Sequence, residues 1–157
     1  MKNFNLKNRG ITLAEILISV SIMAVLIAIF VVSSSPVSTL ITSRNFERQS
    51  ELNLIMNAIS QNIGDNNGNF VCASGIIPTA TTTMASTTYL AGDYNIAPCL
   101  IPVYLDSFPY DQSSTSAYWT GTTSNNSAYS IIRNSTTGRV KVFAPYSEGS
   151  TTISVTR

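Results

Sequence analysis

The chain has 157 residues, of which 44% are hydrophobic and only 11% charged, and its formal net charge is +1. This length permits one domain, or one small domain with an appendage. The charge balance argues against nucleic-acid binding driven by bulk positive charge. The absence of histidine excludes Ser-His-Asp triads, Cys-His dyads and histidine-ligated zinc. Two cysteines are too few for a four-thiolate metal site or a disulfide-dense miniprotein.

The apolar residues concentrate near the N-terminus. The segment Ile16–Val32 carries no charge, and extending it back to Ile11 adds only Glu15. About 20 apolar residues in a helix cross ~30 Å of hydrocarbon, and a helix satisfies its own backbone there. Basic residues alone precede this run, namely Lys2, Lys7 and Arg9. They predict a cytoplasmic N-terminus, with everything beyond about residue 33 outside.

A secretory signal peptide has a similar layout and is the alternative interpretation of this segment. The apolar run is longer than the roughly 7–15 residues usual for a signal peptide. No small-x-small cleavage site closes the run cleanly, although Val32–Ser35 is a poor version of one. Both features favour a membrane-spanning helix over a signal peptide.

Glu15 is the one charged residue in the predicted apolar helix. A carboxylate at the centre of a membrane helix costs about 2.5–3.5 kcal/mol, and less near the interface, so its partner has to be identified. No basic residue follows it before Arg44. Cleavage after Gly10 would create an α-amino group on Ile11, about one helical turn from Glu15. Pairing of that amine with Glu15, in the same chain or a neighbouring copy, would set the stagger between identical helices.

The residues around this point carry a family resemblance. Lys7-Asn8-Arg9-Gly10 followed by Ile11-Thr12-Leu13-Ala14-Glu15-Ile16 resembles the processing site of type IV pilins and type II secretion pseudopilins. The resemblance implies cleavage after Gly10 by a prepilin peptidase, N-methylation of Ile11, and pairing of Glu15 with the N-terminal amine of an adjacent subunit. Ile11, where Phe or Met is commoner, and Ala14, in place of a larger aliphatic residue, depart from the usual pattern. An ordinary single-span anchor that happens to carry Glu15 is the alternative.

The helix is predicted to continue past the membrane span. A proline inside a helix usually kinks it, so Ser33–Pro36 marks either a kink or the end of the helix. Further along the chain, apolar residues again recur at helical spacing and form one face: Leu52, Ile55, Met56, Ile59 and Ile63. Gly64 is suited to the position just past the end of a helix. We therefore expect one long kinked helix from about Leu13 to Ile63.

Residues 64–157 are expected to form a small head of loops and short antiparallel strands. Segments 79–88 and 122–127 have the composition of a loop and a turn. Strands are predicted at 117–120, 128–133, 139–144 and 152–156, and their short connections favour a meander. The fold class is therefore α+β: a long kinked helix, membrane-spanning in its first half, packed on a small antiparallel sheet, which is the pilin-like arrangement that the resemblance implies. The expected divisions are a leader at 1–10, a membrane or filament-core helix at 11–33, a stalk helix at 34–63 and a head at 64–157.

Cys72 and Cys99 lie outside the membrane in this topology, where an oxidising compartment favours a disulfide between them. Two buried free thiols are the alternative. The pair does not match the C-terminal disulfide that is common in type IV pilins, so it does not indicate that subfamily.

Asp106 and Asp111 form the densest acidic spot in the head. Two carboxylates in a turn, with backbone carbonyls, offer ligands for calcium, and some pseudopilins bind calcium in the corresponding region. Turn-forming residues on a surface loop are the alternative, which the lack of a dense Asp pattern favours. Apart from this calcium, no cofactor is expected.

These observations predict a structural subunit of a type IV filament, either pilin or pseudopilin, and no enzyme. It would sit in the inner membrane with its head outside and then join a surface or periplasmic filament. The expected partners are identical or homologous subunits, the prepilin peptidase, the inner-membrane assembly platform and, before assembly, lipid. The alternative function is a secreted or membrane-anchored binding module or hydrolase with an ordinary targeting segment.

Overall fold

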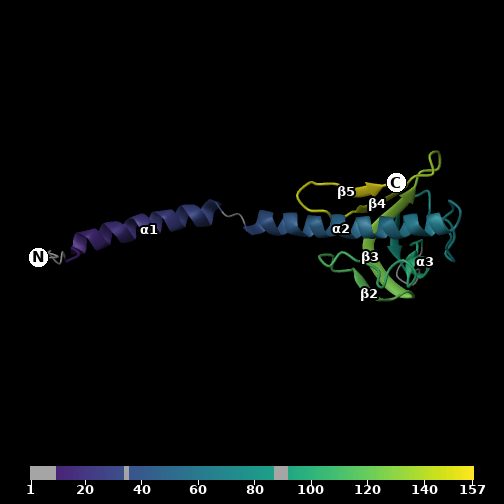
Figure 1. The fold of residues 1–157 in the computed structure, drawn as a ribbon, viewed down its shortest axis with the longest axis horizontal. Helices are drawn as coiled ribbons and strands as arrows, with labels where there is room; N and C mark the ends of the chain where they lie inside the picture. Colours follow the sequence, from purple (N-terminus) through teal and green to yellow (C-terminus); the bar gives the residue numbers. More distant parts are fainter. Residues whose placement is uncertain (1–9, 34–35, 87–91) are drawn as a thin grey trace, which may run out of the picture. The chain divides into compact units, whose positions relative to one another are not determined.

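The computed structural model describes residues 10–33, 36–86 and 92–157. By internal contacts the chain divides into two compact units, Met1–Thr39 and Leu40–Arg157, which are described one at a time. The first contains helix α1, Leu13–Ser33. The second, called the head, contains helix α2 (Pro36–Asp65) from Leu40 onward together with all later elements (Figure 1).

Helix α1 is apolar all round, as its sequence predicts. Its large apolar side chains expose from 53% of their surface at Ile16 to 83% at Val32. Its two polar interruptions are satisfied inside the helix, because the hydroxyls of Ser19 and Ser21 each donate to the carbonyl four residues back at 2.7 Å. α1 is therefore suited to an apolar surrounding supplied by lipid or by other helices.

Helix α1 ends at Ser33 and α2 begins at Pro36. A proline at the first position of a helix costs no backbone hydrogen bond, because that N–H has no partner inside the helix. The predicted kink falls on residues 34 and 35, which lie outside the described residues.

The predicted apolar face of α2 is confirmed. Leu52, Ile55, Met56 and Ile59 are at most 1% exposed and join the core of the head, and Ile63 packs partly against it. The predicted end of this helix is wrong by two residues, since α2 continues to Asp65. The chain leaves the helix through left-handed backbone at Asn67 and Gly68 rather than at Gly64, and the N–H of Gly68 donates to the Ile63 carbonyl at 2.9 Å.

Within the described residues, the sheet is antiparallel throughout and has five strands: β1 (Thr82–Ala85), β2 (Tyr118–Gly121), β3 (Ser124–Arg133), β4 (Val140–Ala144) and β5 (Ile153–Thr156). The predicted meander is confirmed for β2 to β5, because each of these strands pairs with the next. β1 pairs with the other edge of β3, where Ser130 has Thr83 on one side and Phe143 on the other. β3 is thus the central strand of the head.

Two sequence-based loop predictions are wrong. Strand β1 lies inside segment 79–88, of which residues 87 and 88 fall outside the described residues, and β3 begins at Ser124 inside the predicted turn 122–127. β1 is short and lies in a Thr-rich run, and the first residues of β3 are polar, so neither shows the apolar alternation of a strand. Asn126 and Ser127 are nevertheless buried, and their side chains donate to the carbonyls of Ser116 at 3.0 Å and Met84 at 2.7 Å.

One face of the sheet forms the core with α2 and the short helix α3 (Ala97–Leu100), which the sequence analysis did not predict. Figure 1 shows α2 running across the sheet. Val142 of β4 pairs with Ile131 on one side and Val155 on the other. Ile131 and Val142 are fully buried, and together with the apolar face of α2 they hold the head together.

Candidate functional site

The N-terminal candidate residues lie at the start of α1. Gly10, Ile11 and Thr12 precede the helix, and Ile11 is 73% exposed. The backbone N–H of Glu15 donates to the Thr12 hydroxyl at 3.2 Å, which makes Thr12 the N-cap. The peptide bond between Gly10 and Ile11 is therefore in irregular, exposed backbone, the form in which a protease can bind it.

Glu15 occupies the third position of α1, in its first turn. The unpaired backbone N–H groups of a helix start carry partial positive charge, so a carboxylate is favourable here. Ile11 lies two residues before α1 and four positions before Glu15, so both lie at the start of the helix. The structure thus places Glu15 near the position where an amine on Ile11 would be created, at the end of α1 and among exposed apolar side chains.

The predicted disulfide between Cys72 and Cys99 is present. It joins the segment that follows α2 to helix α3, with the two Cα atoms 5.0 Å apart. Asn62, in the last turns of α2, binds the same region, because its side-chain amide donates to the carbonyls of Val71 at 3.1 Å and Cys99 at 3.3 Å. The disulfide and Asn62 together anchor the loop after α2 on the helix.

The two acids considered for calcium have different environments. Asp106 is exposed, whereas Asp111 is 3% exposed. Oδ2 of Asp111 accepts from Nε of Arg48 at 2.9 Å, and Oδ1 accepts from the backbone N–H of Ser113 at 3.0 Å and its hydroxyl at 2.6 Å. Within the described ranges, no group of three or more Asp, Glu, Cys or His side chains is placed to hold a metal ion. The geometry assigns Asp111 to an internal ion pair.

Arg48 is the centre of a charged network that the sequence analysis did not predict. Besides Asp111, it donates to the Asn45 side chain at 2.8 Å and to Glu148 at 3.2 Å, and it also bonds the Ser113 hydroxyl. These contacts join α2 to the 102–113 segment and to the loop between β4 and β5. One indication of this network was present in the sequence: Arg48 lies four residues before Leu52, so it is on the helix face that the apolar residues predict to be buried.

Glu51 and Tyr129 form a second polar contact on the same helix. The Tyr129 hydroxyl donates to Oε2 of Glu51, although Tyr129 is otherwise fully buried. Burial raises the pKa of Glu51, and the nearby Glu47 raises it further, while the hydrogen bond from Tyr129 acts against this. Burial, and then the bond to Glu51, also raises the pKa of Tyr129. Glu51 is only half-buried, so part of this residue remains accessible.

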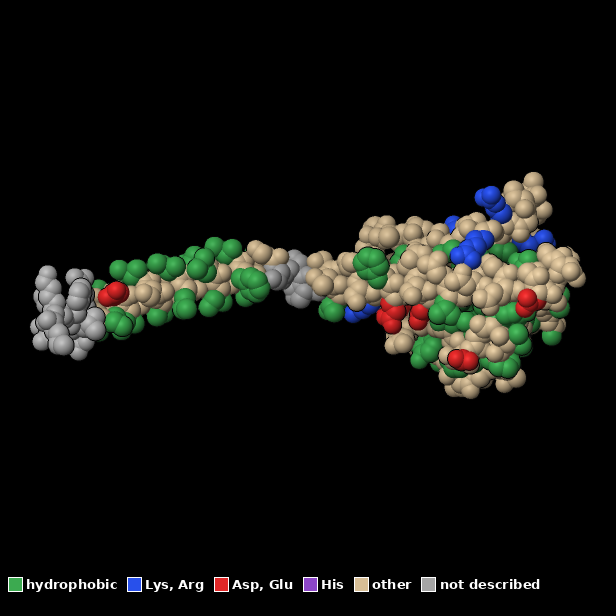
Figure 2. Space-filling view, viewed as in Figure 1, with side chains coloured by type: hydrophobic (Ala, Val, Ile, Leu, Met, Phe, Trp, Pro, Cys, Tyr) green, Lys and Arg blue, Asp and Glu red, His purple; other side chains and the backbone are tan. Residues whose placement is uncertain are grey.

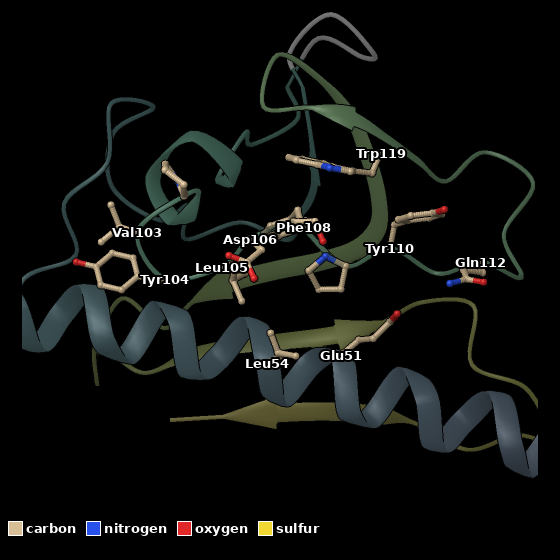
Figure 3. A pocket seen from close by; sticks show the side chains of 13 residues that line it. Glu51, Leu54, Val103, Tyr104, Leu105, Asp106, Phe108, Tyr110, Gln112 and Trp119 are labelled. Carbon is tan, nitrogen blue, oxygen red and sulfur yellow. The ribbon is translucent and has the colours of Figure 1, made fainter.

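A groove runs between α2 and the 102–112 segment, with a volume of about 590 Å³. A second hollow of about 410 Å³ adjoins it, since Glu51 and Gln112 line both, and Glu47 lies in this second part. In Figure 3 Glu51 and Leu54 project from α2 toward Phe108, Tyr110 and Trp119 on the opposite side. We call the two hollows together the acidic groove. Its aromatic side chains are Tyr104, Phe108, Tyr110 and Trp119, and its accessible carboxylates are Glu47, Glu51 and Asp106.

An apolar N-terminal helix and a helix packed on a small antiparallel sheet define a pilin-like α+β fold. Residues 5–31 match the prokaryotic N-terminal methylation motif, the prepilin-type motif that is typical of type IV pilins and pseudopilins. The resemblance predicted from Gly10, Ile11 and Glu15 is thereby confirmed. Comparison with curated protein sequences and comparison with solved structures give no match.

The motif has consequences for processing and location. It implies cleavage by a prepilin peptidase and assembly of the pilus type. Among the residues that the structure describes, one helical stretch, which begins at Leu13, is long and apolar enough to cross a membrane. With the motif, this is consistent with anchoring in the inner membrane before assembly. Proteins of this kind are generally structural subunits without enzymatic activity.

Proposed function

We propose that this protein is a structural subunit of a type IV filament, a pilin or pseudopilin. Residues 1–10 form the leader that prepilin peptidase removes, and residues 11–33 form the helix that first spans the membrane and then joins the filament core. Residues 34–63 are the stalk, and residues 64–157 complete the head that coats the outside. The observation that carries this proposal is the match of residues 5–31 to the methylation motif at the start of an apolar helix with no buried side chain.

Glu15 is the assembly residue in this proposal. A carboxylate among apolar helices is costly unless an opposite charge compensates it, and the amine of a methylated Ile11 on an adjacent subunit supplies that charge. A wrong stagger leaves both charges without a partner, so the pair selects one axial offset between copies. The inner-membrane assembly platform and identical or homologous subunits are the partners that this mechanism requires.

The first test is the N-terminus of the mature protein, measured by intact mass and Edman sequencing. We expect the mature chain to start at N-methylated Ile11. A start near Ser34–Pro36 would instead indicate an ordinary secreted protein, and an uncleaved chain a plain anchor. Either outcome contradicts the filament function.

Two variants separate processing from assembly. A Cβ added at Gly10 would meet no atom within 4 Å, so Gly10→Val should leave the described fold intact and block cleavage through the peptidase. Glu15→Ala should be cleaved and inserted normally but should fail to form filaments. Ser19→Ala, one turn further along α1, is the control and should assemble like the wild type. Normal filaments from Glu15→Ala would contradict the proposed role of the carboxylate.

A further inference from the structure

The head carries its charges in two separate places. Four cations lie at the end of the sheet where β3 and β4 are connected and β5 ends; they form the basic tip, Arg133, Arg139, Lys141 and Arg157. Lys141 is opposite Thr156 of β5, and the backbones of Val140 and Arg157 exchange two hydrogen bonds of 2.8 and 3.0 Å. Sheet register therefore gathers four residues that are spread over 25 positions of sequence.

In the part of the chain that the structure describes, no Asp or Glu side chain forms an ion pair with the basic tip. All three ion pairs in that part of the chain involve Arg44 or Arg48. After Asp111 the sequence contains a single further acid, Glu148, and those same two arginines bind it. Arg133 donates to the Ile77 carbonyl and Arg157 to the Ser60 hydroxyl, each at 3.4 Å, and Lys141 lies 5.5 Å from the centre of the Phe143 ring. These partners carry no charge, so the positive charge of the tip is not neutralised by them.

The acidic groove has the opposite character. Its arginines, Arg44 and Arg48, are already held by Asp111 and Glu148, whereas Glu47 and Asp106 are exposed and Glu51 is half-buried. On the face of the head seen in Figure 2, most of the blue side chains lie along its upper edge and most of the red ones along its lower edge. One chain thus carries two surfaces of opposite sign.

The groove is also chemically matched to arginine and lysine side chains. Guanidinium and ammonium groups bind the faces of tryptophan and tyrosine rings, and they gain more where a carboxylate is adjacent. Trp119, Tyr110 and Tyr104 are half-buried at the groove, beside Glu51 and Asp106. The occupant that this lining fits best is a cationic surface rather than a neutral or acidic one.

We propose that the basic tip of one copy docks in the acidic groove of a neighbouring copy. Two different surfaces of the same chain that fit each other make a heterologous contact, which propagates into an open assembly instead of closing as a symmetric dimer. This inference rests on the proposed filament function and adds to it a contact between heads. The pairing of Glu15 sets the stagger of the helices, and the contact between tip and groove sets which faces of the heads meet.

The test uses full-length chains with reversed charge on one surface at a time. The tip variant is Arg139→Glu/Lys141→Glu and the groove variant is Glu47→Lys/Asp106→Lys. Each variant alone should lose filament mass about tenfold or more, because the tip variant removes the net positive charge of the tip and the groove variant places cations opposite cations. Co-expression of the two should restore filaments, since the two introduced glutamates of one variant can then meet the two introduced lysines of the other, while unchanged tips meet unchanged grooves, in alternating order.

The control variant is Thr151→Glu/Thr152→Glu. Both residues are exposed in the loop between β4 and β5, at the opposite end of these strands from the tip. This variant adds two negative charges outside both surfaces and should assemble like the wild type. Thermal unfolding of every variant verifies that the head is intact.

The other possible results of this experiment decide whether the contact between heads, the filament function, or both are wrong. Normal assembly of either reversed variant alone, or failure of the mixture to assemble, overturns the proposed contact. The filament function would still stand if Glu15→Ala abolished assembly in the same experiment. A wild-type chain that is cleaved elsewhere than after Gly10 and forms no filaments would overturn the function and this inference together.

Discussion

The buried ion pair between Arg48 and Asp111 gives the sharpest prediction about the stability of the head. The two side chains are 3% and 4% exposed, and Nε of Arg48 lies 2.9 Å from Oδ2 of Asp111. Asp111→Ala leaves the guanidinium buried without its main partner, a change that costs about 3–5 kcal/mol in comparable sites. Glu148 remains 3.2 Å from Nη2 of Arg48, so we expect the lower end of this range, about 3 kcal/mol.

Two further variants test the reasoning behind that magnitude. Arg44 forms an exposed pair with Glu148, with 47% and 29% of the side chains accessible, so Arg44→Ala should cost about 1 kcal/mol or less. The double variant Arg48→Met/Asp111→Leu removes both buried charges, and it should be more stable than Asp111→Ala because no charge is left without a partner.

The measurement is urea unfolding of the full chain in detergent. Trp119 is the single tryptophan and lies in the head, so its fluorescence reports unfolding of the head alone. The reasoning is refuted if Asp111→Ala and Arg44→Ala unfold at the same urea concentration. It is equally refuted if the double variant is less stable than Asp111→Ala.

Three other predictions use the same unfolding assay. Reduction of the Cys72–Cys99 disulfide opens a loop of sequence separation 27 and should cost about 3 kcal/mol; an unchanged midpoint would contradict this. Leu52→Ala should cost about 2–5 kcal/mol because Leu52 is fully buried, whereas Leu54→Ala, at a residue 46% exposed, should cost less than half as much. Burial raises the pKa of Glu51 above its ordinary value of 4.5, so the folded state keeps the proton of this carboxyl group to higher pH than the unfolded state does. The contribution of Glu51 to the stability of the head is therefore lost as the pH rises from 4.5 through the raised pKa. Glu51→Gln should therefore be more stable than the wild type at neutral pH, and the gap should close toward pH 4.5; a constant gap would refute this.

Most of the N-terminal site could be predicted from sequence. Gly10, Ile11 and Glu15 lie within one short segment, and the length of the apolar run is a property of composition alone. The apolar face of α2 was predictable for a related reason, because helical spacing places Leu52 and Ile59 on one side whatever the rest of the chain does.

Strands β1 and the first half of β3 could not be predicted in the same way. β1 has only two buried apolar residues, Met84 and Ala85, at the end of a Thr-rich run, and the first half of β3 buries polar side chains. Burial of Asn126 or Ser127 is favourable only because carbonyls from distant segments accept their hydrogen bonds. No local pattern in the sequence contains that information.

The sequence by itself predicted a cleavage point after Gly10 and a membrane-spanning segment, and it determined which face of α2 meets the sheet, because each follows from neighbouring residues and a fixed helical period. Only the tertiary structure decided that Asp111 pairs with Arg48, 63 positions away, instead of standing as an independent acid. It also decided that four scattered cations share one end of the sheet, while Glu51 and Asp106 share a groove with aromatic rings. The physical reason is that charge acts through space, and distances between residues remote in sequence are set by packing of the core.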